Sequence, residues 1–320
     1  MGTSEFAVPS LRALHSAGHP ILAVVTRPDR PRARRSDPPG PTPVKAAAAA
    51  EGFAILEPEA PRDPAFVEAV RGLAPEAVVV AAYGRILPPE ILAIPPRWCI
   101  NLHASLLPRH RGAAPVARAL LAGDRVTGVT TMRMDRGLDT GDILLQEECA
   151  IGIGETCGEL TARLAERGAG LVVKTLERLE RGGLEPRRQD AREATLAPAL
   201  SRDDGRIDWT APADAIANRV RACNPWPIAF AGLGGRIVQI LRAEASFGPV
   251  PGPRAAPPGR IFLAAGDCIL VRCGGDVGLS ILELRFPGRR AVSARDAVNG
   301  RLVRQGDDFG QAPRGPGASA

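Results

Sequence analysis

The first half of the chain alternates continuous apolar runs with segments of helical periodicity. Four apolar runs predict strands, at residues 20–26, 53–56, 76–82 and 98–103. Helices are expected after Thr42-Pro43 and Asp63-Pro64, because Thr and Asp cap helices and proline suits the first turn. Strands that are apolar throughout are typical of a parallel sheet covered by helices on both faces. The pattern therefore predicts an α/β fold with a doubly wound, mostly parallel sheet.

A long helix and a polar segment separate the first half of the chain from a second part with a different hydrophobic pattern. Thr156–Arg181 carries leucine and valine at helical spacing and stops at Gly182-Gly183. Residues 185–200 are polar and irregular, which predicts a linker. The chain is thus expected to form a first domain at 1–184 and a second at 201–304, with a frayed tail at 305–320 that is rich in Gly, Pro and Asp.

Beyond the linker, short strands alternate with glycine and proline turns. A helix is expected over residues 211–223. Five strands are expected after it, at residues 228–230, 236–243, 259–263, 268–272 and 277–284. Five short strands of this kind indicate a small β-barrel.

Two polar blocks follow predicted strands of the first domain. Asn101 and His103 stand at alternate positions at the end of an apolar strand, so their side chains share one face. The carboxyl ends of strands are where open α/β sheets bind ligands. The second block, Gly137-Leu-Asp139-Thr-Gly-Asp142, forms a tight acidic loop after a strand. A helix is expected to begin near Ala114-Pro115.

These blocks resemble those of the folate-dependent formyltransferases. Further matching segments extend the resemblance over nearly the whole chain: Glu5-Phe-Ala-Val-Pro9, Pro28-Asp-Arg-Pro31, Ala82-Tyr-Gly84, Ile207-Asp-Trp209 and Asn224-Pro-Trp-Pro227. The resemblance implies that the catalytic trio is Asn101, His103 and Asp139. It further implies an OB-like second domain and a folate pocket lined by Ser105, Leu106, Leu107 and Pro108.

The implied reaction moves a formyl group from 10-formyltetrahydrofolate to the amine of methionine esterified to initiator tRNA, in translation initiation. Such transfer needs donors for the tetrahedral oxyanion and a group that removes the amine proton. Asn101 can donate to the oxyanion, and His103 can donate or shuttle a proton. Asp139 can hold His103 and a water. The sequence leaves open which group moves the proton.

Two other functions remain open at this point. One is a formyltransferase acting on a small amine, such as a nucleotide sugar or glycinamide ribonucleotide, and the other is a non-catalytic RNA-binding protein. A basic loop and a complete second domain favour tRNA, while the presence of all three trio residues counts against a non-catalytic role. A Ser105-His103-Asp139 hydrolase triad is discounted, because no Gly-x-Ser-x-Gly elbow surrounds the serine. Asp135 and Asp142 are expected to be turn residues beside glycine.

The charge distribution is compatible with a polyanionic partner. The net charge is +6, with an isoelectric point near 9.4. Residues 27–35 form an arginine-rich loop that suits phosphate contacts. The predicted tRNA contacts are Arg30, Arg32, Arg34, Arg35 and Arg202, of which Arg34 is carried over from the family. Trp226 is expected to pack in the core of the second domain.

The sequence shows no apolar run of membrane-spanning length and no signal peptide, so we expect a cytoplasmic protein, and a monomer. Six cysteines without Cys-x-x-Cys pairs predict thiols and no metal site. The family begins with a strand that leads into the Gly2-Thr3 turn. Because this chain starts at Met1, we expect the sheet to lack its first strand and the natural protein to be several residues longer.

Overall fold

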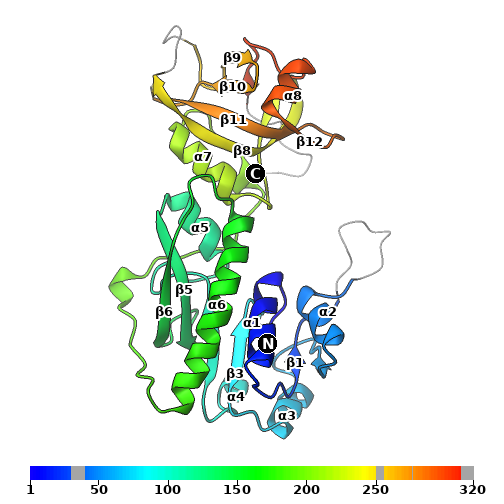
Figure 1. Ribbon diagram of the computed structural model, residues 1–320, viewed down its shortest axis with the longest axis vertical. Coiled ribbons are helices and arrows are strands. Elements are labelled where there is room, and N and C mark those ends of the chain that lie inside the picture. The colour runs from blue at the N-terminus through cyan, green and yellow to red at the C-terminus, as the bar shows by residue number, and fades with distance from the viewer. Residues whose placement is uncertain (30–39, 250–255, 276, 311–320) are drawn as a thin grey trace. The chain divides into compact units, whose positions relative to one another are not determined.

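The computed structural model describes residues 1–29, 40–249, 256–275 and 277–310, which fall into two compact units (Figure 1). The first unit comprises Met1–Pro115, Val126–Ala150 and Leu160–Pro198. The second comprises Val116–Arg125, Ile151–Glu159 and the described part of Ala199–Ala320. Within these ranges, no helix combines the length and the apolar character that crossing a membrane requires.

The first unit contains a two-stranded parallel sheet, formed by the first two strands, and a four-stranded sheet that begins with a parallel pair. The strands are β1 (Val24–Val25), β2 (Ile55–Leu56), β3 (Val78–Ala81), β4 (Cys99–His103), β5 (Val126–Arg133) and β6 (Ile143–Ala150). β1 pairs with β2 and β3 with β4, both in parallel. β5 and β6 continue the sheet in antiparallel fashion, in the order β3-β4-β5-β6. The predicted α/β class is confirmed.

Two helices, α2 (Pro43–Ala50) and α3 (Pro64–Gly72), begin where the capping residues predict. The other helices up to residue 180 are α1 (Val8–Ser16), α4 (Pro89–Leu92), α5 (Pro115–Ala122) and α6 (Cys157–Glu180), and most of α5 and the start of α6 belong to the second unit. Thr42 Oγ1 accepts from the backbone N–H of α2 residue Lys45 at 3.1 Å, and Asp63 caps α3 in the same way. α6 packs against the sheet, since Gly168 lies so close to Leu102 of β4 that a Cβ there would meet it at 2.7 Å.

Met1 and Gly2 lie between β1 and β3, where the first strand is expected. The Gly2 N–H donates to Val25 O at 2.9 Å, and the Ala81 N–H donates to Met1 O at 3.0 Å. The amino group of Met1 donates to Val79 O at 2.6 Å, and burial lowers its pKa to about 6. A cavity of about 600 Å³, lined mainly by apolar side chains of α1, β1, β3 and α6, adjoins these two residues.

The segment predicted as a linker is largely part of the first unit. We call residues 187–197 the strap. Arg187 and Ile143 exchange two backbone hydrogen bonds of 2.8 Å at one end. At the other end, Arg111 donates its backbone N–H to Thr195 O at 2.8 Å and accepts from Ala197 N at 2.7 Å. The linker prediction is wrong here because the strap is held by backbone hydrogen bonds to the start of β6 and to Arg111, and such bonds do not require the apolar pattern that marks ordered elements.

The second unit is an antiparallel sheet that curls into a small barrel. Its strands follow the order β13 (Phe309–Gly310), β7 (Ala229–Leu233), β8 (Arg236–Pro249), β11 (Val277–Arg285), β10 (Cys268–Val271) and β9 (Ile261–Ala265), and β12 (Ala291–Ser293) pairs with β11. Phe309 N–H donates to Gly259 O at 2.8 Å, which joins the two ends of the sheet. The helix α7 (Ala213–Ala222) packs Ile216 and Val220 into the core. A short helix α8 (Ala294–Asn299) follows β12. The barrel prediction is confirmed.

Two expectations for this unit are wrong. The tail does not fray at residue 305: Phe309 is 2% exposed and stacks on Trp209 with ring centroids 5.2 Å apart. One apolar residue among glycines and aspartates is enough to anchor β13. Trp226 is 57% exposed, so it does not belong to the core. Residues 311–320 lie outside the described residues.

Candidate active site

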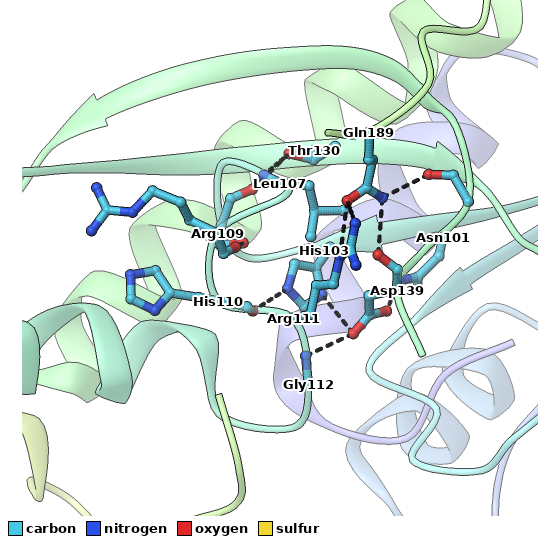
Figure 2. Close-up of polar contacts among 12 residues, drawn as sticks. Asn101, His103, Leu107, Arg109, His110, Arg111, Gly112, Thr130, Asp139 and Gln189 are labelled. Atoms are coloured by element: carbon cyan, nitrogen blue, oxygen red, sulfur yellow. Dashed lines mark hydrogen bonds and ion pairs between the residues drawn. The ribbon is translucent and has the colours of Figure 1, made fainter. Parts of the chain in front are cut away.

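The structure brings the side chains of Asn101, His103 and Asp139 together in the first unit (Figure 2). Asn101 and His103 project from the same face of β4, and Asp139 comes from the loop between β5 and β6. Asn101 Nδ2 lies 3.5 Å from Asp139 Oδ1, and His103 Nδ1 lies 3.7 Å from Asp139 Oδ2. The carboxylate therefore faces both other members.

The contacts of His103 identify its protonated ring nitrogen. His103 Nε2 lies 2.9 Å from the carbonyl oxygen of His110. A carbonyl oxygen only accepts, so we assign the hydrogen of the neutral ring to Nε2. Nδ1 is then the position that can take up a further proton, and it faces Asp139. The His103 side chain is 6% exposed and the Asp139 side chain 12%, so the two groups interact with little screening by water.

Asp139 is held in an uncommon backbone conformation. Its φ is 54°, in the left-handed region that a residue other than glycine rarely occupies. Its Oδ2 accepts from the backbone N–H of Gly112 at 2.9 Å. Strained residues of this kind persist when surrounding contacts determine them, and they gather at active sites. The loop places one carboxylate oxygen on a backbone amide and leaves the carboxylate beside His103.

The segment predicted to line the folate pocket is fixed in place by hydrogen bonds to neighbouring residues. Ser105 Oγ donates to Arg109 O at 2.6 Å and makes no hydrogen bond with His103, so no serine triad forms. Thr130 Oγ1 donates to Ser105 O at 2.6 Å and accepts from Leu107 N–H at 3.2 Å. Ser105, Leu107 and Pro108 are buried, and only Leu106 is partly exposed. Leu106 is thus the side chain of this segment that a ligand can touch.

A cavity of about 360 Å³ lies beside the Asp139 loop. Its lining includes Trp98, Met134 and Asp142. Arg133, also in the lining, lies over the Trp98 ring at 5.0 Å from the centroid. Asp135 binds the Gly137 N–H and the Thr140 hydroxyl of its own loop, as expected of a turn residue.

Three residues hold this site without having been predicted from the sequence: Gln189, Thr195 and Arg111. Gln189 of the strap contacts the Asp139 loop and Arg111, and Thr195 Oγ1 accepts from His110 N–H at 2.8 Å. Nothing in their local sequence distinguishes them from other polar residues. Of the predicted tRNA contacts, Arg202 is exposed in the second unit, next to a 3₁₀ helix at Asp203–Gly205. The other four predicted contacts, Arg30, Arg32, Arg34 and Arg35, lie outside the described residues.

The fold and the site match family models over both parts of the chain. The model described as formyl transferase matches residues 1–176, and the model for its C-terminal domain matches residues 199–302. An α/β sheet that carries Asn101, His103 and Asp139, followed by a small barrel, therefore defines a protein of the formyltransferase class.

Curated relatives narrow this class. The chain is 48% identical to the methionyl-tRNA formyltransferase of Heliobacterium modesticaldum, over 97% of this chain and 98% of the relative. It is 44% identical to that of Solibacter usitatus over 97% of both chains, and 47% identical to that of Anaeromyxobacter dehalogenans strain 2CP-1 over 94% and 95%. The chain belongs to the methionyl-tRNA formyltransferase family.

Solved structures share the fold at lower identity. The sugar 3N-formyl transferase WlaRD, solved with dTDP and 5-N-formyl-THF, superposes with a TM-score of 0.64 at 15% identity, covering 90% of this chain and 97% of its own. HypX from Aquifex aeolicus, in complex with tetrahydrofolic acid, gives 0.57 at 17% identity over 85% of this chain and 46% of its own. These similarities concern the fold alone.

Proposed function

We propose that the chain transfers the formyl group of 10-formyltetrahydrofolate to the α-amine of methionine esterified to initiator tRNA, in the cytoplasm. The observation that carries the proposal is the meeting of Asn101, His103 and Asp139 at the end of β4. It is supported by the 48% identity to a methionyl-tRNA formyltransferase over almost the whole chain.

The reaction exchanges one bond of the formyl carbon for another and moves one proton. The amine nitrogen attacks the formyl carbon, the bond from that carbon to N10 of the folate breaks, and the amine proton ends on N10. The folate supplies the formyl group as an activated amide. Asn101 is the oxyanion donor, because its Nδ2 carries two hydrogens and its contact to Asp139 is a long one of 3.5 Å.

The proton leaves the amine toward the pair formed by His103 and Asp139. The hydrogen on His103 Nε2 is already given to the carbonyl of His110, so Nδ1 is the ring position that accepts. The imidazolium that results lies between two acceptors, the His110 carbonyl and the Asp139 carboxylate. Asp139 thereby stabilises the charge that develops on His103.

We assign the folate contact to the segment Ser105–Pro108, with Leu106 as the exposed apolar surface for the flat ring system. Leu106→Ala is then expected to raise KM for the formyl donor about tenfold and to leave KM for Met-tRNA unchanged. Met134→Ala, in the neighbouring cavity, is the matched control. A raised donor KM for Met134→Ala and an unchanged one for Leu106→Ala would place the folate in that cavity.

Initiator tRNA is the proposed amine carrier, and the loop arginines together with Arg202 are the proposed phosphate contacts. The runner-up substrate is a small amine on a nucleotide sugar. The solved sugar formyltransferase shares the fold at 15% identity, whereas the methionyl-tRNA relatives share close to half the residues. The comparison with relatives therefore favours tRNA.

The test offers Met-tRNA, an amino sugar nucleotide and glycinamide ribonucleotide in parallel, with 10-formyltetrahydrofolate as donor. Formylation of Met-tRNA with a kcat/KM at least a hundredfold above either small amine supports the proposal. A preference for one of the small amines would make that amine the substrate in place of Met-tRNA. If none of the three amines is formylated, the proposed reaction is wrong.

A further inference from the structure

Gln189 is a buried side chain that the proposed reaction does not use. It lies in the strap, it is 7% exposed, and both ends of its amide are bound. Nε2 donates to Asp139 O at 2.9 Å and to Gly141 O at 2.6 Å. Oε1 accepts from Arg111 Nε at 3.0 Å and from Arg111 Nη2 at 2.7 Å. Two donors and two acceptor positions are the full capacity of an amide, so this side chain is saturated.

The two donor contacts act on the loop that carries the catalytic carboxylate (Figure 2). They fix the carbonyl of Asp139 itself and that of Gly141, two residues further on. Asp139 holds a φ of 54°, in the left-handed region that a residue other than glycine rarely occupies. A bond to the carbonyl of the strained residue restrains its ψ and hence the direction of its side chain.

The acceptor contacts act on the opposite loop. Arg111 stands between His110, whose carbonyl binds His103 Nε2, and Gly112, whose N–H binds Asp139 Oδ2. The loop from residue 110 to residue 112 thus touches two members of the trio directly. Gln189 connects this loop to the Asp139 loop through a single side chain.

We propose that Gln189 is a positioning residue for formyl transfer, which sets the separation of the His103 ring and the Asp139 carboxylate from both sides. The inference rests on the proposed function, since it concerns the same trio. The Gln189 side chain binds the backbone carbonyl of Asp139, and it makes no hydrogen bond to the His103 ring or to the Asp139 carboxylate. Its effect is therefore on turnover through geometry, because a displacement of about 1 Å in a catalytic group costs up to about a hundredfold.

The test uses the full chain with three substitutions. Gln189→Met keeps the length and apolar volume and removes every hydrogen bond. Gln189→Glu keeps the acceptor for Arg111 and turns an oxygen toward the two carbonyls. Asp190→Asn is the matched control in the strap, because the Asp190 carboxylate binds the backbone N–H and the exposed side chain of Arg192.

We expect Gln189→Met and Gln189→Glu to lower kcat by about 10-fold to 100-fold and to leave KM for both substrates within about twofold. Asp190→Asn is expected to keep wild-type kcat. In a His103→Ala background, Gln189→Met should reduce the residual rate less than twofold, because a residue that acts through the trio has nothing left to position. A purely structural residue would instead reduce the rate by the same factor in both backgrounds.

Amide hydrogen exchange at Gly112 gives a readout that does not depend on the reaction. Exchange should accelerate at least fivefold in Gln189→Met if the Asp139 carboxylate moves off this amide, at an unchanged melting temperature. Wild-type kcat and unchanged exchange in Gln189→Met overturn the inference while the proposed function stands. A wild-type chain that does not formylate Met-tRNA overturns the proposed function, and the role of Gln189 in it, together.

Discussion

Asp139→Asn isolates the charge of the trio, because it removes one negative charge and almost no volume. His103 Nδ1 and Asp139 Oδ2 are 3.7 Å apart, and both side chains are at most 12% exposed. At that separation two opposite unit charges attract by about 4 kcal/mol for an effective dielectric constant near 20. Each 1.36 kcal/mol of lost transition-state stabilisation is a factor of ten. The substitution should therefore lower kcat/KM by about a thousandfold.

The assay is formylation of Met-tRNA under single-turnover and steady-state conditions, with thermal unfolding alongside. The Asn side chain can still accept from the Gly112 N–H, so the loop is expected to stay folded. Asp135→Asn is the control in the same loop, because both Asp135 oxygens bind within the loop and not the trio. A loss below about tenfold in Asp139→Asn, at normal stability, would refute the argument that the carboxylate stabilises charge on His103.

Three further expectations concern other parts of the chain. Gly112→Ala should destabilise the fold by about 1–3 kcal/mol in urea unfolding, because φ is 125° and a Cβ would lie 2.7 Å from a strap carbonyl; wild-type stability would contradict this. At the start of α6, hydrogen bonds from Thr156 and from an arginine lower the pKa of Glu159 to about 2, so its stabilisation is present above pH 4.5 and lost as the pH falls toward 2. Melting curves of Glu159→Gln should therefore differ from wild type at pH 7, by at most about 1 kcal/mol, and coincide with it near pH 2. Replacing the loop arginines at residues 30–35 by alanine should flatten the salt dependence of tRNA binding, with Arg34→Ala the strongest single change, whereas an unchanged slope would remove the loop from tRNA binding.

The meeting of Asn101 and His103 could be predicted because it depends on the period of a single strand. Two residues apart on β4, they share a face wherever that strand packs. The helix starts at Thr42 and Asp63 were equally local, since each cap acts within three residues of itself. Asp139 could be assigned to the trio only through the family resemblance, because no local rule connects a loop 36 residues downstream of His103 to the end of β4.

The role of the strap could not be predicted, and the reason is physical. Gln189 reaches backbone carbonyls that lie 48 and 50 residues earlier in the chain. Any amide of the right length could make these bonds, and backbone carbonyls carry no sequence signal. A polar segment that is held in place by backbone hydrogen bonds and polar side chains has the composition of a linker. The strand at Phe309 could not be predicted for a related reason, because a single aromatic residue does not create a hydrophobic period.

The most direct test of the account follows labelled formyl from 10-formyltetrahydrofolate into Met-tRNA, with the wild-type chain and with the Ala variants of Asn101, His103 and Asp139. We expect rapid labelling of the methionyl amine by the wild type. We also expect labelling to fall by about a hundredfold or more in each variant, with melting temperature and tRNA affinity nearly unchanged. Near-normal labelling by any folded variant, or no labelling by the wild type, would contradict it.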